Sequence, residues 1–450
     1  TDKGDEEIDA TGGSLIDGIA LPAGSRPQGI VIDNAGSRAY VACQGSGELR
    51  SYAVGDRDLQ AVLSLGGTPR ALALTGDGER LLVTRFISPD SGGEVWDVAT
   101  GDLSLTRTIE LGLSTAADNG SNGRGLPNYL SDVAISPDGQ RAWVTAKKDN
   151  IERGVFLENQ DLSQDQTVRA MLAVIDLTTN TERFDERIDI DNSDSPVGLA
   201  FSPLGDWVFV GLQGNNRYVA YDALAIRRIG ESGVVLNQDT GSAPQGVLVA
   251  GDRLWTHNFL SRQVGYRSLA DFFVDGTPPS NTAETTGLGG SEKLAGAVLT
   301  GKRIFYHAED PRMSAEGYIS CATCHRDGGQ DGRTWDFTGR GEGLRNTITL
   351  RGQAGMGHGN VHWTANFDEI QDFEHDIRGP FGGSGFLSDS DFAATDDPLG
   401  ATKAGRSSDL DALAAYVASL DTDHIPASPH RDSDGSLTDE AEAGEALFKQ

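Results

Sequence analysis

The chain has 450 residues, with 37 lysines and arginines against 67 aspartates and glutamates, which gives a formal net charge of −30. So acidic a chain does not suit nucleic acid or an anionic membrane as a partner, and no apolar run approaches the roughly 20 residues of a membrane-spanning helix. The length indicates two or three domains, and three cysteines are too few for a disulfide framework.

Residues 1–12 are acidic and polar, and they predict a flexible N-terminal tail. They show no signal-peptide pattern and read as the start of an already processed chain. A tail of this kind could also follow a lipidated cysteine. A lipid anchor at a lost N-terminus is therefore an open alternative.

Residues 13–280 contain a repeated pattern of two β-rich runs joined by a short turn with Gly or Asp, and most units have a third run. The repeats start at positions 27, 69, 130, 196 and 244, at intervals of 42, 61, 66 and 48 residues. A period in the forties with several strands per unit predicts the blades of an all-β propeller. The longer intervals contain polar insertions, 116–128 and 147–167, which we expect as loops on one rim.

These units resemble the bacterial YVTN-type β-propellers. Five repeats are clear, and since closed rings of this kind usually have about six to eight blades, we expect seven. The resemblance does not assign an activity to the propeller, so we expect a docking or substrate-binding scaffold. Four tryptophans in this region are expected to pack within the blades: Trp96, Trp143, Trp207 and Trp255.

A segment rich in Pro, Gly, Ser and Thr predicts a domain boundary, with the linker at 281–293. After it, residues 294–306 have the apolar spacing of a helix. The sequence Cys321-Ala322-Thr323-Cys324-His325 then forms a C-x-x-C-H run, the attachment pattern of c-type haem. Both thiols add to the haem vinyl groups, and His325 binds the iron. A zinc site would need four ligands, and the only other cysteine, Cys43, lies far away in the sequence.

Residues 408–420 predict a second helix with one apolar stripe, capped at its start by Ser407 or Ser408. Two helices around a C-x-x-C-H run are the frame of a class I cytochrome c. We therefore expect an all-α cytochrome c domain at 294–425, with one covalently bound haem c.

Four segments in this domain resemble the bacterial dihaem cytochrome c peroxidases and the related MauG proteins: 301–305, 319–325, 344–350 and 361–363. That family has two cytochrome domains, each opened by a Gly-x-x-Leu-Phe helix. Residues 444–448 repeat this opening, so the resemblance implies that 426–450 are a linker and the start of a second, truncated domain. A second haem would then be bound beyond Gln450.

The residue opposite His325 on the iron decides between catalysis and electron transfer. Met356 and His358 lie in a Gly-rich loop that can approach the haem, and we rank them equally as ligands. His362 ranks slightly behind them, because it stands where the family has a His or an aromatic residue beside a Trp.

The family's peroxidases have a distal His just before the Arg-Asn motif, and residues 336–343 contain none. Glu342 or Arg340 could replace it as an acid/base group or charge stabiliser. By resemblance, Trp363 relays electrons between the two haems. Arg345 and Asn346 are expected to contact a haem propionate or to hold the loop, since an Arg fork suits a carboxylate.

These observations predict an extracytoplasmic haem c redox protein of the dihaem peroxidase/MauG type, located in the periplasm or at the cell surface. The alternative is an electron-transfer cytochrome with a six-coordinate haem and no catalysis of its own. Either protein needs a redox partner, and the acidic chain favours a cationic cytochrome or another electron carrier.

Overall fold

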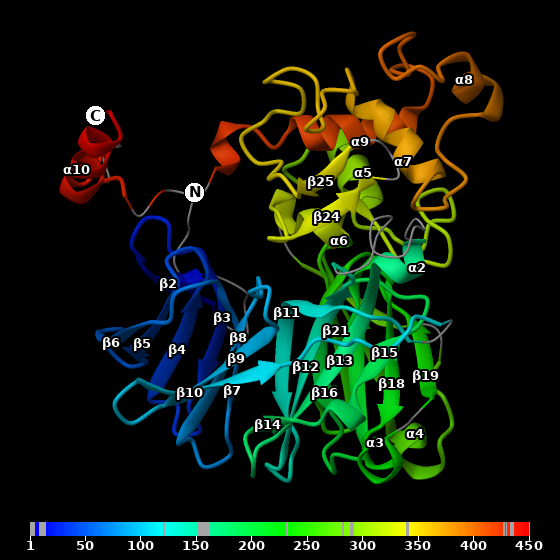
Figure 1. Ribbon diagram of the computed structural model, residues 1–450. Coiled ribbons are helices and arrows are strands. Elements are labelled where there is room, and N and C mark those ends of the chain that lie inside the picture. Colours follow the sequence, from blue (N-terminus) through cyan, green and yellow to red (C-terminus); the bar gives the residue numbers. More distant parts are fainter. Residues whose placement is uncertain are drawn as a thin grey trace. The chain divides into compact units, whose positions relative to one another are not determined.

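The computed structural model describes residues 5–8, 15–119, 122–151, 163–230, 233–280, 283–288, 292–338, 342–425, 428, 430–432 and 436–449. The chain divides into two compact units (Figure 1). Unit 1 contains Thr1–Phe86, Val95–Thr108 and Asp423–Gln450, and unit 2 contains Ile87–Glu94 and Ile109–Thr422. Most of the predicted tail, part of the predicted linker and Arg340 lie outside the described residues.

Unit 1 contains one four-stranded antiparallel sheet and most of a second. The first sheet consists of β3 (Pro27–Ile32), β4 (Arg38–Cys43), β5 (Glu48–Ala53) and β6 (Leu59–Ser64). The second consists of β7 (Pro69–Leu74), β8 (Arg80–Arg85), β9 (Gly93–Ala99) and β10 (Ser104–Leu111). A hairpin of β1 (Asp5–Ile8) and β2 (Leu15–Ile19) precedes them, and helix α10 (Asp439–Phe448) belongs to the same unit.

Unit 2 contains three further sheets of the same design. The first has β11 (Leu126–Ile135), β12 (Arg141–Asp149), β13 (Val168–Asp176) and β14 (Thr181–Glu182), with β15 (Ile188–Ile190) also paired to β13. The second has β16 (Pro196–Phe201), β17 (Trp207–Leu212), β18 (Arg217–Asp222) and β19 (Val234–Asp239), followed after β18 by helix α3 (Ala223–Ile229). The third has β20 (Pro244–Ala250), β21 (Arg253–Asn258), β22 (Gln263–Ser268) and β23 (Glu284–Gly287), with helix α4 (Ala270–Asp275) before β23.

These sheets are the blades of a β-propeller, because each is an antiparallel meander of about four strands. The predicted propeller is therefore confirmed, with one correction. The described residues form five blades, and the prediction of seven is wrong. All five repeats recognised in the sequence became blades, and the described residues between them form no degenerate blade. We expected further blades because related rings usually have six to eight, but that usual number does not determine how many blades one particular chain forms.

The Pro-x-Gly at the start of β3 and of β16 has a steric cause. A Cβ on Gly29 of β3 would lie 2.3 Å from the Arg70 carbonyl oxygen of the next blade, and one on Gly198 of β16 would lie 2.8 Å from the Val247 nitrogen. The strand register also shifts between the proline and the glycine in β3, β16 and β20. In β3 and β16 the innermost strand therefore approaches the next blade so closely that only glycine fits. Gly246 of β20 is not constrained in this way, because an added Cβ there would lie 3.9 Å from its nearest neighbour, the Cβ of His257.

The carboxy-terminal part of unit 2 contains short helices joined by irregular segments, and Figure 1 shows it beside the ends of the blade strands of the same unit. Its helices are α5 (Gly296–Phe305), α6 (Cys321–His325), α7 (Glu374–Arg378), α8 (Asp389–Ala394) and α9 (Ser408–Ala418). Strands β24 (Thr334–Phe337) and β25 (Gly343–Asn346) form a small antiparallel sheet between them, so this part is not all-α as predicted. No helix in the described part of the chain has the length and apolar character needed to cross a membrane.

Helices α5 and α9 cross closely and form the core of this part. A Cβ on Gly301 would lie 1.8 Å from the Ala412 carbonyl oxygen, and the rings of Phe305 and Tyr416 meet edge to face at 5.0 Å. Ser407 caps α9, because its side chain accepts a hydrogen bond from the Leu410 N–H. It is one of the two residues predicted for this position. The two helices predicted at 294–306 and 408–420 are thus present with slightly shorter bounds.

The segment 367–378 differs from its sequence pattern. Its spacing predicts one amphipathic helix, but the structure has a 3-10 turn (Ile370–Phe373) followed by α7. The Asp372 carboxylate accepts the N–H groups of Asp368 and Glu369, which ties the chain into a turn before the helix can start. Phe367, Ile370 and Ile377 are buried nevertheless, so the apolar pattern is satisfied by a shorter element.

We expect Gly301→Ala to destabilise unit 2 by about 1–3 kcal/mol, because the added methyl group collides with the main chain of α9. Gly296 is the matched control. It lies in the same helix with no atom near its added Cβ, so Gly296→Ala should leave stability unchanged or raise it slightly. Urea unfolding of both variants measures the difference, and equal stability would contradict the close helix crossing.

Candidate functional site

The C-x-x-C-H run folds as one short capped helix, α6. Ser320 precedes it in an extended conformation and forms a capping box with Thr323, whose hydroxyl accepts the Ser320 N–H at 2.8 Å. Ala322 and Thr323 are buried, while the two cysteines and His325 are partly exposed. The helix therefore fixes the motif by its buried face and leaves the three reactive residues at its edge.

His325 is held in one tautomer by the main chain that follows the helix. Its Nδ1 lies 3.2 Å from the Gly329 carbonyl oxygen, and because a carbonyl can only accept, Nδ1 carries the proton. Burial lowers the pKa of His325, which favours the neutral ring. A neutral ring protonated at Nδ1 keeps a lone pair on Nε2, as a metal-binding histidine requires.

The two cysteines of the motif are free and lie in different apolar surroundings. Cys321 packs against the core of α5 and α9, and Cys324 packs beside Trp335 and Ile319. Burial raises the pKa of the Cys321 thiol to about 12 and that of Cys324 well above its usual range. Among the described residues, no group of three or more His, Cys, Asp and Glu side chains is arranged to bind a metal ion. The donor set fits a covalently attached haem, which needs two thiols and a single imidazole.

A buried aspartate of the propeller holds the first turn of α6. Asp194 precedes β16 and accepts hydrogen bonds from the hydroxyls of Ser320 at 3.1 Å and Thr323 at 3.0 Å. Its own N–H bonds to Asn215, whose amide also reaches the Gly317 carbonyl. The loops around β16 and β17 therefore hold, by hydrogen bonds, the segment that leads into the motif.

Strand β11 holds the other end of the helix. The Tyr129 hydroxyl donates to the Cys324 carbonyl oxygen at 2.8 Å, and the Arg326 guanidinium donates to the Ser131 hydroxyl at 3.0 Å. Tyr129 has a left-handed backbone, with φ at 50°, where a non-glycine residue is uncommon. Hydrogen bonds from two blades thus fix both ends of the motif helix.

A buried charge cluster lies between β12 and the loop after α6. Lys147 Nζ is 3.0 Å from Asp149 and 2.9 Å from Asp331, and the three side chains are at most 4% exposed. Asn128 donates to the Asp149 carboxylate and to the Asp331 carbonyl, and Trp335 Nε1 donates to the Asp331 carboxylate. We call Lys147, Asp149 and Asp331 the charge cluster.

The three predicted iron ligands lie in different environments. Met356 is partly buried and packs against the same core as Cys321, because Gly355 sits against Ala418 and holds the loop on α9. His358 is exposed. His362 is partly buried and lies against Phe367, with ring centroids 4.1 Å apart and the ring planes tilted by 37°. The structure thus separates the three candidates, which the sequence left close in rank.

His362 and Glu342, predicted for different roles, come together in one acidic group. His362 Nδ1 lies 3.3 Å from Glu342 and its Nε2 lies 3.6 Å from Asp376. Although burial opposes it, the carboxylates raise the pKa of His362 overall. His362 lies against Phe367, which belongs to the same core that Cys321 packs against, so this group lies on the Cys321 side of the motif. The charge of Asp376 adds to the effect of burial in raising the pKa of the Cys321 thiol. The sequence did not single out Asp376, because an acidic residue on a predicted helix is common and does not by itself indicate a functional site.

The remaining predicted residues lie along β25. Trp363 is 60% exposed and donates from Nε1 to the Asn346 carbonyl oxygen at 2.8 Å. Arg345 Nη1 donates to the Leu344 carbonyl, while its Nε is buried without a hydrogen-bond partner. Trp363 and Leu344 have large exposed apolar surfaces beside this unpaired nitrogen. These features suit a strand against which a group with an apolar body and a carboxylate could pack. The Trp beside Cys324 is Trp335, which the sequence did not single out.

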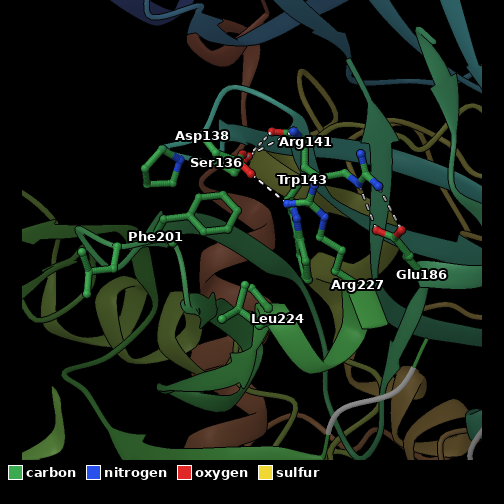
Figure 2. A pocket seen from close by; sticks show the side chains of 12 residues that line it. Ser136, Asp138, Arg141, Trp143, Glu186, Phe201, Leu224 and Arg227 are labelled. Atoms are coloured by element: carbon green, nitrogen blue, oxygen red, sulfur yellow. Dashed lines mark hydrogen bonds and ion pairs between the residues drawn. The ribbon is translucent and has the colours of Figure 1, made fainter. Parts of the chain in front are cut away.

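Figure 2 shows a hollow in unit 2, between the blade of β12 and the blade of β17. Trp143 and Phe201 meet edge to face at 5.9 Å in its wall, as expected of a blade-packing tryptophan. Its charged side chains are paired with one another, Arg141 with Glu186 and Arg227 with Asp138. The hollow therefore presents no unpaired charge that would select a ligand.

Comparisons with known proteins do not assign the chain to a family. No family model matches it, and no curated protein does. Solved structures similar to it include hydrazine synthase of Kuenenia stuttgartiensis (15% identity, TM-score 0.30, covering 56% of this chain and 97% of that one). Others are a functionally unknown protein from Desulfotomaculum acetoxidans (14%, 0.41, 61% and 74%) and a chain of a nidogen/laminin complex (14%, 0.39, 63% and 88%). The propeller assignment rests on the strand topology.

The charge cluster predicts a pH dependence of stability. Burial raises the pKa of Asp149 from its ordinary 3.8 to about 6, so the folded chain binds the proton more tightly than the unfolded chain. This contribution is fully present below about pH 4 and is lost as the pH rises through 6, by about 3 kcal/mol at most. The pKa of Asp331 is lowered, so its contribution changes only at more acidic pH.

Asp149→Asn should therefore reduce the loss of stability between pH 4 and 6, as measured by urea unfolding at several pH values. Asp185→Asn is the control, since hydrogen bonding by Arg183 lowers the pKa of that exposed carboxyl below this window. An unchanged slope in Asp149→Asn would contradict the assignment.

Proposed function

We propose that this chain is an extracytoplasmic haem c redox protein in which Cys321 and Cys324 carry the haem and His325 is the proximal iron ligand. The observation that carries this proposal is the short capped helix α6, with Nδ1 of His325 bonded to the Gly329 carbonyl. Bound haem would supply reversible electron transfer and a site for peroxide. The close pair α5 and α9 serves as the frame of a class I cytochrome domain.

The propeller holds the motif helix in position, and it also provides a surface on which a partner could dock. Asp194 and Tyr129 hold the two ends of α6, so the motif keeps its orientation whether or not a partner is present. Bacteria attach c-type haem outside the cytoplasm, which places the protein in the periplasm or at the cell surface. The net charge of −30 suits a cationic electron carrier as redox partner.

A peroxidase/MauG type of reaction is supported by the Glu342, His362 and Asp376 group on the Cys321 side of the motif. O–O bond cleavage needs a group that takes a proton from one peroxide oxygen and returns one to the other. Glu342 is suited to this role because it is nearly buried and paired with His362, which can share the proton. It takes the place of the distal histidine that residues 336–343 lack.

Electron transfer without catalysis is the second candidate, and the position of Met356 favours it. Met356 packs on the same core as Cys321, whereas His358 is exposed. A thioether ligand from this loop would close the sixth position of the iron and raise its reduction potential.

Haem attachment is tested by mass spectrometry of the chain made in a bacterial periplasm with the c-type maturation system. The wild type should carry one covalently bound haem, and the double variant Cys321→Ser/Cys324→Ser should carry none. Cys43→Ser is the control and should retain the haem, since Cys43 is buried in unit 1. Wild-type chain without haem would overturn the proposal.

Peroxide kinetics then separate the two functions. If Glu342 is the acid/base group, Glu342→Gln should slow the reaction of the haem with hydrogen peroxide by about 10²-fold or more. Glu309→Gln is the control, because Glu309 is half exposed and pairs with Arg217 at 3.4 Å, away from the motif helix.

A wild type that is low-spin and inert to peroxide would instead favour electron transfer. In that case Met356→Ala should convert the ferric spectrum to high-spin, while His358→Ala and His362→Ala should not. Full activity of Glu342→Gln would remove Glu342 from the mechanism.

A further inference from the structure

The charge cluster has a negative charge that nothing within it balances. Lys147 contributes one positive charge, and Asp149 and Asp331 contribute one negative charge each, so the three sum to −1 when both acids are ionised. The neighbouring cations have partners outside the cluster: Arg333, which is 2% exposed, pairs with Asp90, which is 87% exposed, and the charge of Arg326 acts on Asp194. The excess negative charge is therefore local to this cluster.

The cluster lies beside the Cys324 end of the motif helix. Lys147 Nζ lies 4.7 Å from the centroid of the Tyr129 ring, and the Tyr129 hydroxyl donates to the Cys324 carbonyl oxygen at 2.8 Å. Burial raises the pKa of the Cys324 thiol well above its usual range, and the charges of Asp331 and Asp149 add to this rise. Trp335 connects the two, since its ring packs beside Cys324 while its Nε1 donates to the Asp331 carboxylate at 3.2 Å. The group attached at this sulfur would thus lie next to the excess charge.

Burial makes this charge effective. The side chains of Asp149 and Asp331 are 0% exposed, so water and salt screen them little, and their field at a neighbouring group is stronger than that of surface carboxylates. Ferric haem has one more positive charge than ferrous haem. A buried negative charge beside it therefore stabilises the ferric form and lowers the reduction potential.

We propose that Lys147, Asp149 and Asp331 form an electrostatic site that lowers the reduction potential of the haem attached at Cys324, with two of the three residues supplied by the propeller. The inference rests on the proposed function and deepens it. The propeller is then part of the redox centre, because strand β12 contributes Lys147 and Asp149. Asp331 comes from the loop that follows the motif helix.

The test is a spectroelectrochemical titration of the haem in Asp331→Asn at pH 8, where both acids of the wild type are ionised. The substitution keeps the shape of the side chain and leaves Lys147 paired with Asp149, so the cluster becomes neutral. The midpoint potential should rise. Asp149→Asn also makes the cluster neutral and should shift the potential in the same direction, which keeps the test available if one variant fails to fold.

Glu186→Gln is the matched control. Glu186 is also a buried acid of the same blade, paired with Arg141 at 3.2 Å at the opposite end of β12 from Lys147. Its loss should leave the potential unchanged. An equal rise in this control would indicate a general effect of charge or stability and would overturn the inference.

An unchanged or lower potential in Asp331→Asn and Asp149→Asn, with haem still covalently bound, would overturn the inference and leave the proposed function intact. A cluster that only stabilises the fold would give that result, and both variants would then be less stable than the wild type. Absence of covalent haem in the wild type would overturn the proposed function and this inference with it.

Discussion

The ion pairs of Lys147 with Asp149 and Asp331 are the constraint on which the candidate site depends. Burying three charges costs several kcal/mol per ion, and the attraction between them offsets this cost only when the geometry is good and the remaining hydrogen bonds are made. Asn128 donates to one oxygen of Asp149 and Trp335 to Asp331, while the other oxygen of Asp149 has only its ion pair with Lys147. Since the arrangement would be costly if any partner moved, it fixes the loop after the motif helix relative to β12.

The remaining polar contacts of the motif helix also come from the propeller blades. Asp194 reaches the start of α6 and Tyr129 reaches its end, so a helix of only five residues is held by two blades. A helix this short has little stability of its own. Its orientation is therefore a property of the propeller, and this links the two sequence patterns, repeat and motif, in one site.

The apolar face of the same helix is held differently. Cys321 packs on the core of α5 and α9, where Gly301 lets the two helices approach within main-chain contact. The acidic group of Glu342, His362 and Asp376 lies on this side, whereas the charge cluster lies on the side of Cys324. The two ends of the motif helix thus border different charged groups, the His362 group near Cys321 and the charge cluster near Cys324.

The sequence by itself determined the blades, the motif and the two framing helices, because strand alternation, turn residues and the C-x-x-C-H spacing are local patterns. It could not determine the number of blades beyond the five repeats, since ring size is not encoded in any one unit. Only the tertiary structure decided which acids surround the motif. Lys147 and Asp331 are 184 residues apart, and each looks like an ordinary surface charge until folding removes both from water.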